Sequence, residues 1–319
     1  MAEWLVEEGI GEHRALLVEG DQVLAARIEG PGRLAAGLVE DAPLVQFDPK
    51  ARRGFARFAN GEEALVDRLP AGSREGAAVR LEVTRAALAE SGRLKRAQAR
   101  PTTAGPRAAP SLAEALSARV VPRFPDGLWE DVWADAWTGE IAFPGGALLF
   151  APTPAMTVVD IDGNMPPPQL AREAVGPLAA ALRRLDPGGS IAIDFPSLAD
   201  KAQRREVDQL LGDALVDWPH ERTAMNGFGL VQIVARLERP SLLHRLALSR
   251  AGSAARILLR RGEWVAEPGA LLLTAHPEVT ARLREDWLAE LARRTGREVR
   301  VSADPALALE GGFAQAVPR

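Results

Sequence analysis

The sequence predicts a mixed α/β protein built from several units, and three patterns carry this prediction. Between Met156 and Phe195, two short apolar runs flank an amphipathic segment, which is the pattern of a strand, a helix and a second strand. Residues 37–97 contain several short strand-like runs separated by turn residues, as in a small β-barrel. Residues 243–319 alternate helical and strand-like stretches, which indicates a small C-terminal α/β unit. A chain of 319 residues can form two or three units of this size.

The N-terminal part of the chain is expected to be rich in β-structure. Residues 1–36 predict a β-hairpin, because strand-like runs between Trp4 and Ile28 are separated by glycine turns. The predicted barrel follows over residues 37–97. Residues 98–110 are expected to be a linker, because the prolines and glycine between Arg100 and Pro106 suit neither a helix nor a central strand.

Residues 111–242 are expected to form the central domain. It opens with Ser111 and Glu114, which have the spacing of a helix-capping box. Three tryptophans at four-residue intervals would share one helix face, which we interpret as core or interface: Trp129, Trp133 and Trp137. Further runs predict a strand, a helix and a strand, in that order, at Glu140–Phe150, Lys201–Leu215 and Gly227–Val234.

The C-terminal unit is expected to contain two helices and two strands. Leu243–Leu259 has a helical pattern, and Ala270–Ala275 that of a buried strand. Pro277 is expected to begin a helix that reaches Thr295, with Gly296 as its C-cap. Val299–Val301 is expected to be the last strand.

Composition excludes several classes of protein. Apolar residues make up 47% and charged residues 26%, which is ordinary for a globular protein. No apolar run approaches about 18 residues, so no membrane span is expected, and the N-terminus lacks a signal pattern, so we predict a cytoplasmic protein. Cysteine is absent, which excludes disulfides, thiol catalysis and any cysteine-ligated metal. The net charge of −4 does not indicate nucleic-acid binding, but a local positive patch is enough for it.

A carboxylate lies inside each apolar run of the central domain. Because side chains alternate along a strand, Asp160 and Asp162 share one face, and Asp194 of the second strand can join them if the strands are neighbours. Oxygen ligands without cysteine suit Mg²⁺ or Mn²⁺, and hydrolysis of a phosphodiester is the natural use of such a site. The alternative is that these aspartates cap turns at the strand ends, because Asp162 is followed by Gly163 and Asn164.

Other hydrolase mechanisms fit the sequence less well. A carboxylate-pair glycosidase is conceivable, but aromatic residues that would stack on sugars are scarce near the acids. The sequence has no Gly-x-Ser-x-Gly and no Gly-Lys-Ser/Thr, which argues against a serine hydrolase of that type and a P-loop enzyme. Four histidines and no His-Glu-x-x-His leave no basis for a multi-histidine metal site.

Aromatic and basic residues stand together in the predicted barrel. Phe55 and Phe58 lie among three arginines, Arg52, Arg53 and Arg57. Aromatic rings can stack on bases while arginines hold phosphates, so this group predicts a surface for single-stranded nucleic acid. The alternative is that the phenylalanines are strand core and the arginines its solvated rim.

Several motifs around the acids occur together in a distinctive order. The two acidic runs read Val-Asp-Ile-Asp at Val159–Asp162 and Gly-Gly-Ser-Ile-Ala-Ile-Asp-Phe at Gly188–Phe195. In these runs the chain resembles the ribonuclease E/G family, which carries an Ile-Asp-Ile/Val-Asn strand and, after a helix, a Gly-Gly-x-Ile-Val-Ile-Asp-Phe strand. Further matches fall in the family's order at Gly145–Phe150, Leu182–Asp186, Arg204–Val207, Phe228–Leu230 and Pro240–Leu242. The resemblance is specific over Ala142–Leu242 and looser elsewhere.

The resemblance implies a fold and an activity. The fold is of the α+β type: an RNase H-like catalytic domain over residues 111–242, joined by the hairpin of residues 1–36, is interrupted by an OB-type barrel over residues 37–97. A small α/β domain at 243–319 completes it. The implied activity is Mg²⁺-dependent endonucleolytic cleavage of single-stranded RNA by metal-activated water, which leaves 5′-phosphate and 3′-hydroxyl ends.

The resemblance also implies roles for individual residues. Asp160 and Asp194 align with the two metal-ligating aspartates of the family. Asp162 stands where the family has asparagine, where it would add a ligand or orient water. In the barrel, the residues implied or expected to contact RNA are Phe55, which aligns with a family aromatic, its neighbours Phe58 and Arg57, and the basic return-loop residues Arg93 and Lys95.

The departures from the family describe a shortened member. The arginine before Phe-Gly-Leu is Gly227 here, and the Cys-Pro-x-Cys zinc link is absent, so no zinc is expected and a homodimer would have to form without it. The segment between the barrel and Ala142 is too short for the family's 5′-monophosphate sensor. These losses keep a rival open, in which the chain is a catalytically degenerate RNA-binding protein with the same fold.

Overall fold

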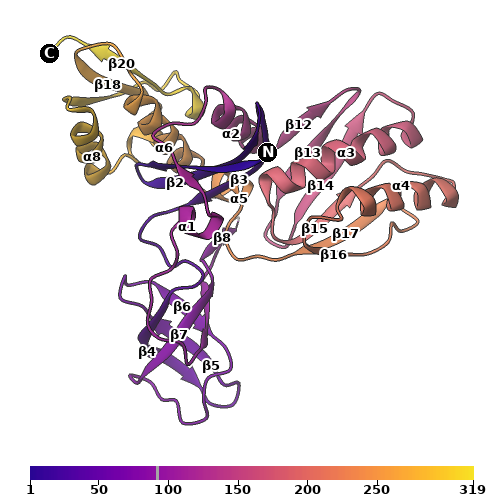
Figure 1. The fold of residues 1–319 in the computed structure, drawn as a ribbon, viewed down its shortest axis with the longest axis horizontal. Coiled ribbons are helices and arrows are strands. Elements are labelled where there is room, and N and C mark those ends of the chain that lie inside the picture. Colours follow the sequence, from indigo (N-terminus) through magenta and orange to yellow (C-terminus); the bar gives the residue numbers. More distant parts are fainter. Residues whose placement is uncertain (91–92) are drawn as a thin grey trace.

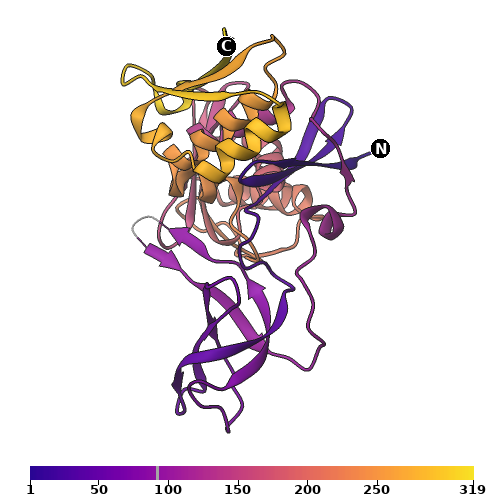
Figure 2. The same cartoon turned by 90° about the vertical axis from the view of Figure 1, so that its left-hand side faces the viewer.

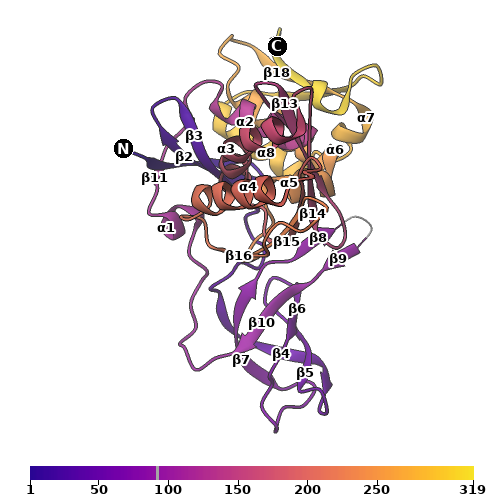
Figure 3. The ribbon, with the colours of Figure 1, turned by 90° about the vertical axis from the view of Figure 1, so that its right-hand side faces the viewer.

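The computed structural model describes residues 1–90 and 93–319, except for the side chains of residues 89, 90, 93 and 94. The molecule consists of a β-barrel and a larger body, with the barrel at the bottom of the view in Figure 1. The body contains a four-stranded N-terminal sheet, a six-stranded sheet and a C-terminal three-stranded sheet. The side views show the same separation between barrel and body (Figures 2 and 3). The predicted mixed α/β class with a β-barrel is therefore confirmed. No helix in the described part of the chain is both long and apolar enough to cross a membrane.

The N-terminal sheet contains the predicted hairpin and extends it. Antiparallel strands β1 (Glu3–Gly9), β2 (Glu12–Glu19) and β3 (Gln22–Glu29) follow the expected runs, and β11 (Arg119–Val120) adds a short parallel strand beside β1. The strand faces that include Leu5 and Leu16 are buried against the central helices.

The barrel is closed by five strands in the order β10-β6-β5-β4-β7. In chain order they are β4 (Val39–Asp48), β5 (Arg53–Arg57), β6 (Glu63–Val66), β7 (Ala78–Arg85) and β10 (Ala97–Pro101). Neighbouring strands are antiparallel except β6 and β10, which run parallel. The barrel has its own apolar core, which is separate from that of the body.

The predicted linker begins too early. Residues 98–101 belong to strand β10, which pairs with both β6 and β7 and closes the barrel. Pro101 is tolerated because it is the last residue of the strand, where a missing amide donor interrupts no further pairing. A small hairpin, β8 (Leu88–Glu90) and β9 (Arg93–Lys95), precedes this strand.

The six-stranded sheet has the order β12-β13-β14-β15-β17-β16. Its strands are β12 (Glu140–Phe143), β13 (Gly146–Pro152), β14 (Thr157–Gly163), β15 (Gly189–Asp194), β16 (His220–Arg222) and β17 (Leu230–Ala235). Only β14 and β15 run parallel, and helix α3 (Pro167–Leu185) makes the crossover between them. Helix α3, with α4 (Lys201–Ala214) beside it, covers one face of this sheet, while alternate residues on the other face are exposed (Figure 1).

Two shorter helices confirm sequence predictions. Helix α1 (Leu112–Leu116) is capped by the predicted box, in which the Ser111 hydroxyl accepts from the Glu114 amide and the Glu114 carboxylate accepts from the Ser111 amide. Helix α2 (Leu128–Thr138) buries all three tryptophans on one face, as the four-residue spacing predicts.

The C-terminal unit differs from its prediction in three places. The first predicted helix is two, α5 (Leu242–Leu248) and α6 (Arg250–Glu263), because the backbone of Ser249 leaves the helical region. The second is also divided, into α7 (Pro277–Thr280) and α8 (Glu285–Thr295), because Arg284 is extended. The strand predicted to be last, β19 (Val299–Ala303), is followed by η1 (Leu309–Gly311) and β20 (Phe313–Val317). The three-stranded sheet has the order β19-β18-β20, with β18 at Ala270–Ala275.

One continuous core joins most of the body, and a small separate cluster packs α1 against β1 and β2. Buried residues of β1, α2, α3, the six-stranded sheet, α6 and β18 belong to a single apolar cluster. A buried ion network also ties α6 to β1, since Arg260 Nε lies 2.7 Å from Glu7 Oε1 and Arg14 Nη1 lies 3.0 Å from the same oxygen. The C-terminal unit therefore packs as part of the body.

Candidate active site

Asp160 and Asp194 lie side by side on the exposed face of the six-stranded sheet. They are register partners in the parallel pair of β14 and β15. Strands in a sheet are about 4.8 Å apart, and partners in a parallel pair point to the same face. The sequence predicted that these acids could share a face, and the register brings them to adjacent positions on it.

Apolar alternation explains why the acids face outward. Val159 and Ile161 of β14 are buried toward helix α3, as are Ile191 and Ile193 of β15. The intervening aspartates must then point to the opposite, exposed face. The crossover helix fixes which residues are neighbours, because it places β15 beside β14 over a defined length.

Neither carboxylate of this pair has an internal partner. Among residues 1–90 and 93–319, no hydrogen bond or ion pair engages the side chain of Asp160 or Asp194. Both residues are exposed, so water screens their mutual repulsion in part. No arginine or lysine of the described residues neutralises the two adjacent carboxylates. Their combined negative charge suits a hard divalent cation, with water as an additional ligand.

Asp162 lies on the same strand face but is engaged differently. Its Oδ1 accepts a hydrogen bond of 2.8 Å from the amide of Gly163, at the end of β14. Among the residues that the structure describes, no three His, Cys, Asp or Glu side chains are grouped so that they could hold a metal ion. The structure thus brings Asp160 and Asp194 together and leaves Asp162 with a local contact to the backbone.

A row of residues crosses the sheet through the acid pair. Leu149 is the register partner of Asp160, and Leu230 that of Asp194. Two residues before Leu230, the Phe228 side chain is 85% exposed. The Asn226 side chain holds this turn, because its Oδ1 accepts from the amides of Phe228 (2.8 Å) and Leu230 (3.1 Å). An aromatic ring is therefore held in solvent next to the strand end that carries Asp194.

Phe228 is a functional candidate that the sequence patterns did not single out. In the sequence, its Phe-Gly-Leu motif contributed only to the resemblance to a family and was not assigned a role of its own. A signal was present, however, since Asn226 and Gly227 form a turn signature directly before an aromatic residue. At Gly227, a Cβ atom would have no heavy atom within 4 Å, so the position opens to solvent.

The barrel residues predicted to bind RNA divide into two groups. Phe55 is half-buried on the outer side of β5, and the Arg96 guanidinium lies 4.5 Å from its ring centroid. Arg57 is exposed beside it and pairs with Glu63 at 2.9 Å. Phe58 is only 2% exposed and belongs to the barrel core. A ring so enclosed cannot stack on a base, so the prediction that Phe58 contacts RNA is wrong.

The basic return-loop residues both fall on the small hairpin. Arg93 begins β9, and its side chain lies outside the described residues. Lys95 ends β9, is half-buried and has a partner within the protein.

Comparison with known proteins adds no assignment. No protein-family model matches the chain, and no curated protein matches it significantly.

Proposed function

We propose that the protein is a Mg²⁺-dependent endoribonuclease of the ribonuclease E/G type that cleaves single-stranded RNA to 5′-phosphate and 3′-hydroxyl ends. The observation that carries the proposal is the register pairing of Asp160 with Asp194 on an exposed sheet face, without any cation of the described residues to neutralise them. Carboxylate pairs of this kind suit Mg²⁺, or Mn²⁺ in its place, with waters and a substrate phosphate as the other ligands.

The residues of the site take distinct roles in this proposal. Asp160 and Asp194 hold the cation, which when bound would neutralise charge on the phosphate and favour attack by water. Asp162, held toward Gly163, positions water or adds an outer ligand. Phe228 offers a ring on which a base next to the cleaved bond stacks, a contact available only in an unpaired strand.

The barrel has the topology that suits an RNA-binding role. We propose that it is of the OB type, because its five strands follow one another around the barrel in the chain order 1-2-3-5-4, with the third and fifth strands parallel. The second and third strands are the usual binding face of such barrels, and β5 presents Phe55 and Arg57 there. The finer assignment of the six-stranded sheet as RNase H-like belongs to the same proposal. Its support is the central parallel pair that carries the acids.

A second candidate function is RNA binding without cleavage. Two features of the sequence favour it: the glycine at position 227, and a segment between the barrel and Ala142 that is too short for the 5′-monophosphate sensor of the family that the chain resembles. In this case the barrel and Phe228 would still bind single-stranded RNA.

One experiment separates the two candidates. Labelled single-stranded RNA is incubated with wild type, Asp160→Asn, Asp194→Asn and the control Asp217→Asn, which replaces an exposed aspartate of the same domain, in Mg²⁺ or in EDTA. We expect Mg²⁺-dependent cleavage by wild type and by the control, and at least a 100-fold loss in the first two variants. RNA binding without cleavage by wild type supports the second candidate, and unchanged cleavage by Asp160→Asn and Asp194→Asn contradicts the assigned site.

A further inference from the structure

A second site lies at the junction of the barrel and the body. A pocket of about 300 Å³ is walled by the connection from β3 to the barrel, by the Glu238–Pro240 segment, and by α1, α5 and α6. This segment leaves the body where the Glu238 carbonyl accepts a hydrogen bond of 3.0 Å from Ala86, which follows β7. Small-molecule sites occur preferentially at such junctions between structural units, and this volume falls at the lower end of their range.

The pocket is distinct from the acid pair. Asp194 ends β15 and Asp160 lies beside it on β14, whereas Gly188, directly before the N-terminal end of β15, packs against Leu237 beside the pocket. Six residues of strand separate the two ends, and at about 3.3 Å per residue this is about 20 Å. A ligand in the pocket would therefore not contact the proposed metal site.

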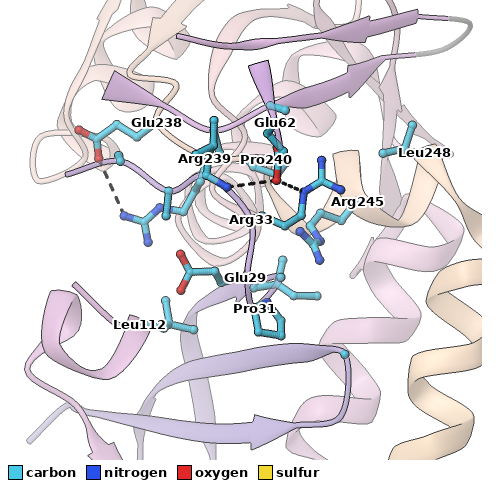
Figure 4. Close-up of a pocket in the computed structure, with 18 of the residues that line it drawn as sticks. Glu29, Pro31, Arg33, Glu62, Leu112, Glu238, Arg239, Pro240, Arg245 and Leu248 are labelled. Atoms are coloured by element: carbon cyan, nitrogen blue, oxygen red, sulfur yellow. Dashed lines mark hydrogen bonds and ion pairs between the residues drawn. The ribbon is translucent and has the colours of Figure 1, made fainter. Parts of the chain in front are cut away.

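Positive charge predominates in the pocket lining. Five arginines face three glutamates, and two of the glutamates already have partners. Glu62 lies 2.7 Å from Arg33, and Glu238 lies 3.8 Å from Arg239. Figure 4 shows these pairs on the upper walls of the pocket, with Glu29 below them.

Among the five arginines of the pocket lining, Arg245 is the one without an ion-pair partner in the described part of the chain. Among the described residues no carboxylate lies within ion-pair distance of its guanidinium, and no hydrogen bond engages it. Burial lowers the pKa of Arg245; the like charges of Arg256 and Arg33 act in the same direction, and Glu12 and Glu29 act against it. Figure 4 shows the Arg245 side chain beside Arg33, in the pocket. Arg245 is half-buried, and a guanidinium partly withdrawn from water without a partner is unfavourable, so a bound anion would reduce that cost.

The remaining neighbours of Arg245 do not satisfy it. Burial raises the pKa of Glu29, which weakens that carboxyl as a permanent counter-ion. Glu12 lies nearer to Arg14, at 2.9 Å, than to Arg256, at 3.9 Å. Arg256 itself donates to the carbonyls of Gly11 and Gly252, which fixes it at the pocket wall.

We propose that this pocket binds a small phosphomonoester, with the Arg245 guanidinium as its principal phosphate contact. A guanidinium presents a planar pair of donors that matches two phosphate oxygens. Arg256 adds positive charge suited to a dianion, while Ile28, Leu34 and Leu112 line the part of the pocket that would receive the rest of the molecule. The proposal is independent of nuclease activity, because it concerns a different set of residues.

The test is calorimetric titration of the full chain with adenosine 5′-monophosphate, adenosine and inorganic phosphate at constant ionic strength. We expect the monophosphate to bind and adenosine not to bind. Arg245→Gln should weaken binding at least 10-fold, while Arg205→Gln, which replaces an exposed arginine of α4, should leave it unchanged. Equal binding of the monophosphate and adenosine, or unchanged binding by a folded Arg245→Gln, would overturn the proposal.

Two further arms keep the test decisive. If Arg245→Gln does not fold, Arg245→Lys retains the charge without the fork and is expected to bind the monophosphate several-fold more weakly than wild type; equal affinity would count against the proposed contact. Inorganic phosphate that competes with the monophosphate shows that the phosphate group is the part recognised, and the absence of competition would contradict this.

Discussion

Asp160 of β14 and Asp194 of β15 are register partners in the only parallel strand pair described in the six-stranded sheet, and both project from its uncovered face. Their proximity places two negative charges on neighbouring strands without a compensating cation among the described residues. Like charges placed opposite one another destabilise a sheet. A divalent cation bound between the two carboxylates would therefore add stability.

The first prediction concerns metal and stability. In EDTA, Asp160→Asn and Asp194→Asn should each raise the free energy of unfolding by about 0.5 kcal/mol, because one of two repelling charges is removed. Millimolar Mg²⁺ should raise the melting temperature of wild type but not of either variant. Thermal unfolding with and without Mg²⁺ measures both effects. An equal response of all three proteins to Mg²⁺ would show that the ion binds elsewhere.

The second prediction separates Asp162 from the pair. Its Oδ1 accepts from the Gly163 amide, and an asparagine oxygen can keep that hydrogen bond. Asp162→Asn should therefore keep the fold and lower Mg²⁺ affinity less than tenfold, whereas Asp160→Asn should lower it by more than 100-fold. Titration with Mn²⁺ followed by electron paramagnetic resonance measures both values. A loss with Asp162→Asn as large as with Asp160→Asn would make Asp162 a direct ligand.

The third prediction concerns the exposed ring of Phe228. Phe228→Ala removes no buried contact, so the free energy of unfolding should change by less than about 0.5 kcal/mol. Loss of base stacking should weaken binding of single-stranded RNA by about 1–3 kcal/mol. Val216→Ala is the matched control, because Val216 is also apolar and 76% exposed. Fluorescence anisotropy with a labelled oligonucleotide measures the affinities, and equal values for the two variants would exclude a stacking role.

Most elements could be predicted because their apolar patterns are local. The alternation in β14 and the amphipathic pattern of α3 are visible in the sequence, and so are the capping box and the tryptophan face of α2. The errors occur where tertiary packing decides. Strand β20 is short and has no fully buried residue, and it forms because β18 offers an edge. The breaks at Ser249 and Arg284 carry neither proline nor glycine, which are the strongest signals of a helix break.

The site was predictable only in part, for related reasons. Alternation places Asp160 on a strand face, but the register that brings it beside Asp194 depends on how α3 packs. Alternation would also have separated the two barrel phenylalanines, since Phe55 shares a face with the exposed Arg53 and Arg57 while Phe58 continues the buried face of Gly54 and Ala56. The pocket around Arg245 joins segments from Gly11 to Trp287, which no local pattern connects.

The fourth prediction uses this contrast within the barrel. Phe55→Ala should weaken RNA binding by about 1–3 kcal/mol, because it removes an accessible ring face. Phe58→Ala should lower barrel stability by about 3–5 kcal/mol, because it leaves a cavity in the core. Urea unfolding and anisotropy titrations at low temperature distinguish the two. If Phe55→Ala destabilises the barrel as much as Phe58→Ala and leaves affinity unchanged, Phe55 is a structural residue.

The last prediction concerns pH and helix α8. Hydrogen bonds from Arg293 and then Arg294 lower the pKa of Glu290 to about 2, from an ordinary value of 4.5. Since the folded pKa lies below the unfolded one, the stabilisation is complete above about pH 4.5 and is lost as pH falls through about 2. Solvent screening limits it to about 0.5 kcal/mol, as for exposed ion pairs. Glu290→Gln should therefore be less stable than wild type at pH 7 and nearly equal to it at pH 2.5 in urea unfolding, while Glu221→Gln, at an exposed position of β16, should show no such change. A stability difference for Glu290→Gln that is the same at both pH values would mean that the ion pairs contribute nothing.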